Sequence, residues 1–202
     1  MSVVGSCSHG AFGRVMLGDD TRGALNGAPC AVAVAPRGYA ENPHPIDKVG
    51  VGYNASPESK VALALAHELA AQTGASVHAL EVVWIGSAAL SGIIPPAIGE
   101  SIDVMIEEAQ SRMTALPDVE GYAVYGLTGE ELAVFGNAVD ILIVGSRDYG
   151  PMRHQVIGST CAYLQRNARC PLLVLPRSAT APGVDFSTSS ELQAKIPAGT
   201  AI

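Results

Sequence analysis

The residues best suited to chemistry lie in a loop from Gly145 to Thr160, with further glycines at positions 150 and 158. Glycine lets a backbone approach a ligand closely, and the free amides at a helix start favour an anionic group. Ser159 and Thr160 add hydroxyl donors at the start of a predicted helix. The loop therefore predicts phosphate binding. The alternative is that its glycines only make tight turns and Ser159 caps the helix.

No G-x-x-x-x-G-K-S/T motif is present in the sequence, which excludes a P-loop. The segment Gly145 to Ser159 instead resembles the G-x2-G-x9-G-[ST] signature of the universal stress protein family. Gly145, Gly158 and Ser159 match the signature, and Asp148 stands at its second glycine position. Cys170–Leu175 is similar to the last strand of that family, and Val49–Ser59 to its first strand and turn. The resemblance covers about 130 residues.

The resemblance implies that ATP or AMP, with or without Mg²⁺, binds in a crevice of the domain. The implied adenine pocket is formed by Gly52, Tyr53, Asn54 and Val82. The implied ribose and phosphate contacts are Val144, Gly145, Arg147, Gly158, Ser159, Thr160 and Cys161. The function implied is that of a nucleotide-binding regulatory protein in a stress response.

Two residues depart from the family pattern. Asn54 stands where the nucleotide binders carry Asp, and Asp148 stands where they carry Gly. Asp148 would put a carboxylate beside phosphate oxygens, although Arg147 or a bound cation could compensate. These departures favour the alternative that the domain binds no nucleotide and acts through dimerisation or a partner protein.

Other reactive side chains form no catalytic or metal-binding pattern. Cys7, Cys30, Cys161 and Cys170 lack zinc-site spacing and are expected to be reduced thiols. Arg153 and His154 are further candidates for phosphate contact. With no Ser/His/Asp or paired-carboxylate arrangement, we predict a binding protein with at most slow ATP hydrolysis. An ATP-using enzyme of the wider adenine-binding α/β group is the remaining alternative.

The elements that must position these residues alternate between strand and helix. Ser56 is a predicted N-cap, Gly74 a predicted helix end, and Thr128 with Glu131 a predicted capping box. The predicted strands are 49–53, 76–83, 121–125, 141–144 and 172–175, and the predicted helices follow Ser56 or cover 102–116, 128–135 and 159–167. The pattern predicts a doubly wound α/β fold: a five-stranded parallel sheet, order 3-2-1-4-5, with helices on both faces.

An internal repeat organises the chain. Residues 4–37 align without a gap on residues 144–177, at a constant offset of 140. We therefore expect residues 1–40 to be the C-terminal remnant of a first domain, 47–177 a complete domain, and 178–202 a disordered tail. We also expect strand Ala31–Ala35 to cover the sheet edge at Leu172–Leu175, either within the chain or in a homodimer.

The composition excludes several classes of protein. The net charge is −7 and no basic stripe is present, which argues against nucleic acid as a partner. No apolar stretch is long enough for a membrane helix, and the first 20 residues lack the pattern of a signal peptide. We expect a cytoplasmic protein.

Overall fold

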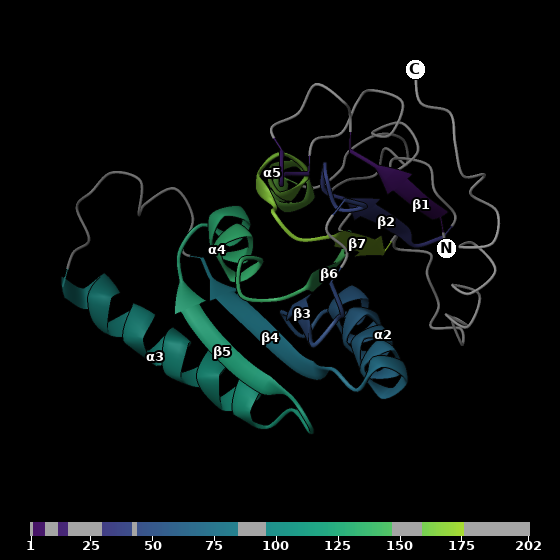
Figure 1. Cartoon of the computed structure of the whole chain (residues 1–202). Coiled ribbons are helices and arrows are strands. Elements are labelled where there is room, and N and C mark those ends of the chain that lie inside the picture. The colour runs from purple at the N-terminus through teal and green to yellow at the C-terminus, as the bar shows by residue number, and fades with distance from the viewer. Residues whose placement is uncertain are drawn as a thin grey trace, which may run out of the picture.

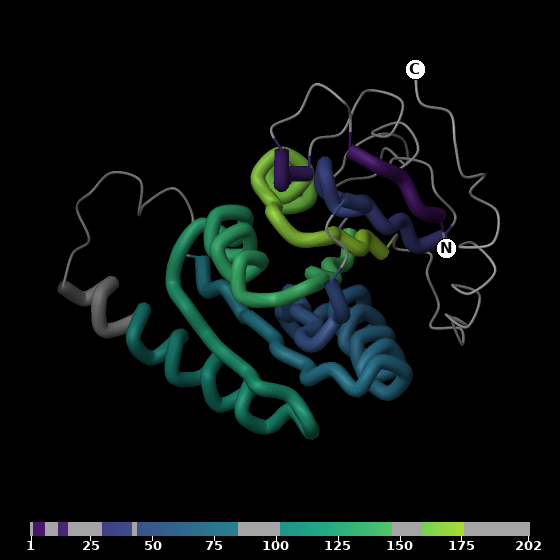
Figure 2. Tube along the Cα trace, in the orientation of Figure 1, coloured from purple at the N-terminus to yellow at the C-terminus, as the bar shows by residue number. Residues whose placement is uncertain are grey.

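Seven strands form one sheet in the computed structural model, which describes residues 2–6, 12–15, 30–41, 44–84, 96–146 and 159–175. The order across the sheet is β1-β2-β7-β6-β3-β4-β5 (Figure 1). All neighbouring strands are parallel except β2 and β7, which pair antiparallel. The tube in Figure 2 follows the same path through the described segments.

Strands and helices alternate from Lys48 onward, as the sequence predicts. The strands are β1 (Ser2–Gly5), β2 (Val32–Ala35), β3 (Lys48–Gly52), β4 (Ser76–Val83), β5 (Glu120–Tyr125), β6 (Ile141–Gly145) and β7 (Leu172–Leu175). The helices are α2 (Pro57–Thr73), α3 (Pro96–Thr114), α4 (Thr128–Phe135) and α5 (Ser159–Asn167). The Ser56 hydroxyl caps α2 by accepting from the Ser59 amide, and Gly74 ends that helix with a φ of 78°.

The helices cover both faces of the sheet. On one face, α2 packs on Val49, Val51 and Ile143, and α3 packs beside it on β4 and β5. On the other face, α4 and α5 pack on Leu142 and Leu172. Alternate strand residues point to opposite faces, so each central strand contributes to both cores.

Strand β3 alternates valine with glycine, and the glycines lie on the α4 face. A Cβ at Gly50 would lie 2.8 Å from a methyl group of Val139 and 3.0 Å from the Phe135 ring. A Cβ at Gly52 would lie 3.3 Å from Leu132. Glycine is therefore what allows α4 and the segment after it to pack closely over the middle of the sheet.

The Asp140 carboxylate holds the beginnings of β3 and β6 together. One of its oxygens accepts hydrogen bonds from the Asp47 and Lys48 amides, at 2.9 and 2.8 Å. The Asp140 amide donates to the Lys48 carbonyl at 2.9 Å. These bonds fix the register of the two central strands, whose carboxyl ends lie side by side.

Two predictions about the fold need correction. A five-stranded parallel sheet is too small, because β1 and β2 extend it to seven strands and make it mixed. The strands from β3 to β7 nevertheless lie in the order β5-β4-β3-β6-β7. The capping box at Thr128 is also wrong. Thr128 is the first residue of α4, Leu127 is the N-cap, and no side chain caps this helix.

Strand β2 covers the edge of β7 within the chain, as the sequence predicts. Val32 pairs with Val174, Ala33 with Leu173 and Val34 with Leu172. The N-terminal part of the chain also contacts the residue that follows α5, because the Val15 amide donates to the Ala168 carbonyl at 2.8 Å. Buried apolar contacts between the two parts form a cluster of Val15, Val32, Val34 and Ala168.

Strands β1 and β2 repeat the register of β6 and β7. Val4 pairs with Val34, just as Val144 pairs with Val174, at an offset of 140 on both sides. The bond from the Ser6 amide to Ala35 has its equivalent in the bond from Ser146 to Leu175. The similarity of these segments in sequence therefore extends to their pairing.

The cluster around Val34 predicts that a charge there will destabilise the protein. Val34 is fully buried, so Val34→Asp should lower the free energy of unfolding by roughly 2–4 kcal/mol. The matched control is Val3→Asp on the neighbouring strand, where the side chain is 68% exposed and the change should cost little. Urea unfolding measures both variants. A loss in Val34→Asp as small as that in Val3→Asp would show that the β2–β7 junction contributes little to stability.

Candidate functional site

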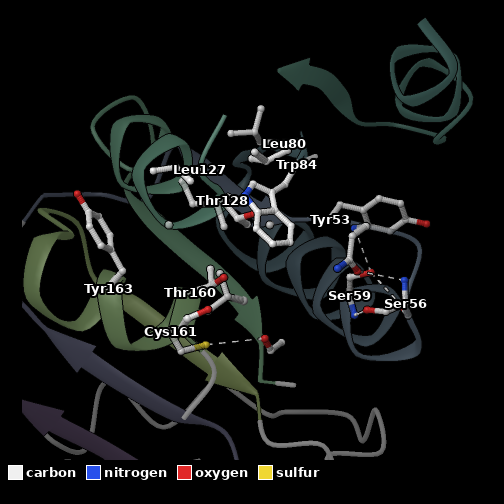
Figure 3. Close-up of a pocket in the computed structure, with 18 of the residues that line it drawn as sticks. Tyr53, Ser56, Ser59, Leu80, Trp84, Leu127, Thr128, Thr160, Cys161 and Tyr163 are labelled. Carbon is white, nitrogen blue, oxygen red and sulfur yellow. Dashed lines mark hydrogen bonds between the residues drawn. The ribbon is translucent and has the colours of Figure 1, made fainter. Parts of the chain in front are cut away.

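A pocket of about 570 Å³ lies at the carboxyl ends of β3, β4 and β6, with α4 and α5 beside it (Figure 3). The strand order reverses between β3 and β6, which is where open α/β sheets bind ligands. The pocket is lined by Gly52, Tyr53, Asn54, Ser56, Glu58, Ser59, Leu80, Val82, Trp84, Leu127, Thr128, Gly129, Glu130, Leu132, Val144, Gly145, Ser159, Thr160, Cys161 and Tyr163.

The turn after β3 forms one side of the pocket and is stabilised by its own polar side chains. The Ser56 amide donates to Asn54 Oδ1 at 3.2 Å, and the Asn54 amide donates to Ser59 Oγ at 3.4 Å. Ala55, between them, has a φ of 59°. Asn54 Oδ1 thus accepts a bond within the turn, and its second lone pair is the part left for a ligand.

Gly145 brings the end of β6 against the start of α2. A Cβ at Gly145 would lie 2.7 Å from the Glu58 Cβ and 3.1 Å from its main-chain carbon. Neither atom is the far end of a flexible side chain, so any larger residue must displace the helix. The closeness of β6 to α2 at this side of the pocket therefore depends on glycine.

The first turn of α5 faces the pocket with Ser159, Thr160 and Cys161. The first amides of a helix have no partner within it and carry the positive end of its dipole. The Cys161 thiol turns inward and donates to the Gly145 carbonyl at 3.9 Å. Burial raises the pKa of the Cys161 thiol to about 11, so any ligand contact from this residue would come from its main chain.

The side of the pocket formed by β4 is apolar, whereas α4 contributes Thr128 and Glu130. Leu80, Val82 and Trp84 alternate along β4 and beyond it, and all three line the pocket. Leu127, at the N-cap of α4, and Tyr163, on α5, also line the pocket. Four further lining residues were not predicted from the sequence: Trp84, Leu127, Thr128 and Tyr163. Continuing the two-residue period of the strand past Val82 would have identified Trp84.

The charged side chains among the described pocket residues are acidic. Glu58 and Glu130 contribute carboxylates, and the described lining residues include no Lys, Arg or His. Arg147, Asp148, Arg153, His154 and Gly158 lie outside the described residues. A cation for a phosphate group would therefore have to come from the 147–158 segment or from a bound metal ion.

The structure brings the predicted site residues together around this pocket, except Arg147 and Gly158, which it does not describe. Their role in binding a nucleotide stays a prediction. Tyr53 needs a qualification: its ring is 8% exposed and belongs to the core under α2, so its main chain is what borders the pocket. Figure 3 shows that ring directed away from Trp84.

The described histidines near the sheet have different partners. His44 lies 3.8 Å from Asp140, whereas the buried His78 contacts Ser76 and Glu120. Within the described segments, no group of three or more His, Cys, Asp and Glu could hold a metal ion. The described helices also include none that is long and apolar enough to span a membrane.

Comparison with known families shows that residues 45–176 match the Universal stress protein family. A universal stress protein of Mycobacterium tuberculosis, Rv2005c, is 28% identical over 186 residues, which are 88% of this chain and 62% of that protein. A second from the same species, Rv2319c, is 25% identical over 189 residues, 86% of this chain and 63% of that protein. The chain thus spans less than two thirds of these curated relatives.

Solved structures share the fold. A universal stress protein from Archaeoglobus fulgidus superposes with a TM-score of 0.58 at 21% identity, over 87% of this chain and 62% of that one. A functionally unknown protein from Pseudomonas aeruginosa, PA1789, superposes with a TM-score of 0.62 at 15% identity, over the same shares. At these identities the likeness concerns the fold alone.

Close packing at Gly145 predicts that its substitution by alanine will be costly. Gly145→Ala should lower the free energy of unfolding by roughly 1–3 kcal/mol, because β6 and α2 must separate. Gly5 occupies the equivalent repeat position, and an added Cβ there would meet nothing within 4 Å. Gly5→Ala should therefore change stability by less than about 1 kcal/mol. Denaturant unfolding compares the two, and a neutral Gly145→Ala would contradict the close approach.

Buried thiols predict a loss of stability at high pH. Burial raises the pKa of Cys161 from 9.0 to about 11 and that of Cys170 to about 12. At a pH between 9.0 and these raised values, the two thiols stay protonated in the folded chain but ionise in the unfolded chain. The free energy of unfolding therefore falls as the pH rises above about 9. The expected loss is about 1 kcal/mol for each thiol at pH 10.

The comparison for this effect is the double variant Cys161→Ala, Cys170→Ala. Its free energy of unfolding should fall less between pH 8 and pH 10 than that of the parent, by about 2 kcal/mol. Equal slopes in the two proteins would mean that the thiols ionise normally in the folded state.

Proposed function

The chain belongs to the universal stress protein family, and on that premise we propose that it binds an adenine nucleotide, ATP or AMP, and acts as a nucleotide-responsive regulator of a stress response. The observation that carries the proposal is the convergence of the predicted site residues on one pocket at the point where the strand order reverses. The volume of this pocket is within the range of small-molecule sites.

The arrangement of the pocket supports a nucleotide in a definite orientation. The apolar end near Leu80 and Val82 suits a base, whereas the first turn of α5 suits phosphate. A ribose would lie between them, near Val144 and Gly145. Mg²⁺ could offset the carboxylates of Glu58 and Glu130 and, in the segment beyond β6, that of Asp148.

The same pocket gives no support for catalysis. Its described lining provides hydroxyls, carboxylates and an amide, but no lysine or histidine that could activate a nucleophile. We therefore propose binding, with at most slow ATP hydrolysis, as the activity of this site.

A second candidate is a domain that binds no nucleotide and acts through dimerisation or a partner protein. The observation that favours it is the negative charge of the described lining, since Glu58 and Glu130 would repel phosphate groups. The edge of β7 is already occupied by β2, so a homodimer would have to use another surface. Analytical ultracentrifugation distinguishes a dimer from a monomer.

The same proposal includes two further assignments: residues 1–40 belong to a preceding copy of the domain, and the protein is cytoplasmic. The repeated register of β1 and β2 supports the preceding copy. The thiols of Cys30, Cys161 and Cys170 are free, which supports a reducing compartment.

Isothermal titration with ATP and AMP, with and without Mg²⁺, tests the proposal. We expect micromolar binding by the parent chain and a loss of about 10-fold or more in Thr160→Glu, which puts a carboxylate beside the proposed phosphate position. The control is Ala64→Glu on the exposed side of α2, outside the pocket lining. Absence of heat with both nucleotides, or equal affinities in all three proteins, would reject nucleotide binding here.

A further inference from the structure

We infer that Trp84 is the residue of this pocket on which the base stacks. The inference rests on the proposed nucleotide-binding function. It concerns a residue that the sequence motifs do not include, and it assigns to that side chain the contact with the base.

The position of Trp84 follows from the strand before it. Leu80 and Val82 point to the α4 face of β4, and Trp84, two residues further on, lines the same pocket. Figure 3 shows its indole projecting among the lining side chains. Strand geometry therefore directs the largest side chain of the segment into the pocket.

The indole is not part of the protein core. Trp84 is 55% exposed, whereas Leu80, on the same face, is 5% exposed. An exposed indole in a concave site leaves a large flat apolar surface in contact with water. A flat ligand that covered it would gain burial and stacking, which is how aromatic side chains hold nucleobases.

The surroundings of Trp84 favour the base over the other parts of a nucleotide. Leu127 and Tyr163, 40% and 36% exposed, line the pocket as well and are also incompletely buried. The hydroxyls of Ser159 and Thr160 belong to α5, the element that suits phosphate.

Trp84 is the single tryptophan of the chain, so intrinsic fluorescence reports on this side chain alone. The experiment titrates AMP into the parent chain and follows both heat and fluorescence. We expect AMP to quench the emission and to reduce quenching by acrylamide.

Variants test the same inference by affinity. Trp84→Ala should weaken AMP binding about 10-fold or more, whereas Trp84→Phe, which keeps an aromatic face, should weaken it less. The matched control is Tyr122→Ala, because Tyr122 is a 40% exposed aromatic on β5 that does not line the pocket. Far-ultraviolet circular dichroism verifies that each variant is folded.

The outcomes separate this inference from the function on which it rests. Binding of AMP with quenching, and weakened binding in Trp84→Ala, supports stacking. Heat of AMP binding without a fluorescence change, with unaltered affinity in Trp84→Ala, overturns stacking and leaves nucleotide binding intact. Absence of any AMP binding overturns both.

Discussion

Close packing at the two central strands is the constraint on which the rest of the structure depends. Gly50 and Gly52 let α4 and the residues after it approach one face of β3, and Gly145 lets the end of β6 approach α2. Asp140 fixes the opposite ends of the same strands. The crevice lies between these strands, where α2 follows β3 on one face of the sheet and α5 packs on the other face.

The pocket that results is divided by chemistry. Its β4 side is apolar, its α5 side presents amides and hydroxyls, and its described charges are negative. Such a division orients an amphipathic ligand without needing many specific contacts, because each end of the ligand is compatible with only one end of the pocket. The described lining residues include no Lys, Arg or His beside these carboxylates.

Much of this could be predicted from the sequence, because local signals and the fold agree. Three elements were predicted with the bounds that the structure shows: strands Ser76–Val83 and Leu172–Leu175, and helix Ser159–Asn167. What could not be predicted depends on contacts distant in sequence. Thr128 has the residue type of an N-cap, yet α4 begins at it and is capped by no side chain. Leu127 and Tyr163 line the same pocket because α4 packs on α5.

The pairing of β2 with β7 has a geometric consequence for the whole sheet. Ala33 pairs with Leu173, which is its own equivalent 140 positions later. An antiparallel pair centred on equivalent residues has a local two-fold axis, the symmetry of a dimer contact formed here inside one chain. The carboxyl ends of β1 and β2 therefore lie at the opposite end of the sheet from the pocket, because these strands run antiparallel to β7. A ligand crevice built on β1 would open away from this one, and the two could not enclose a common ligand.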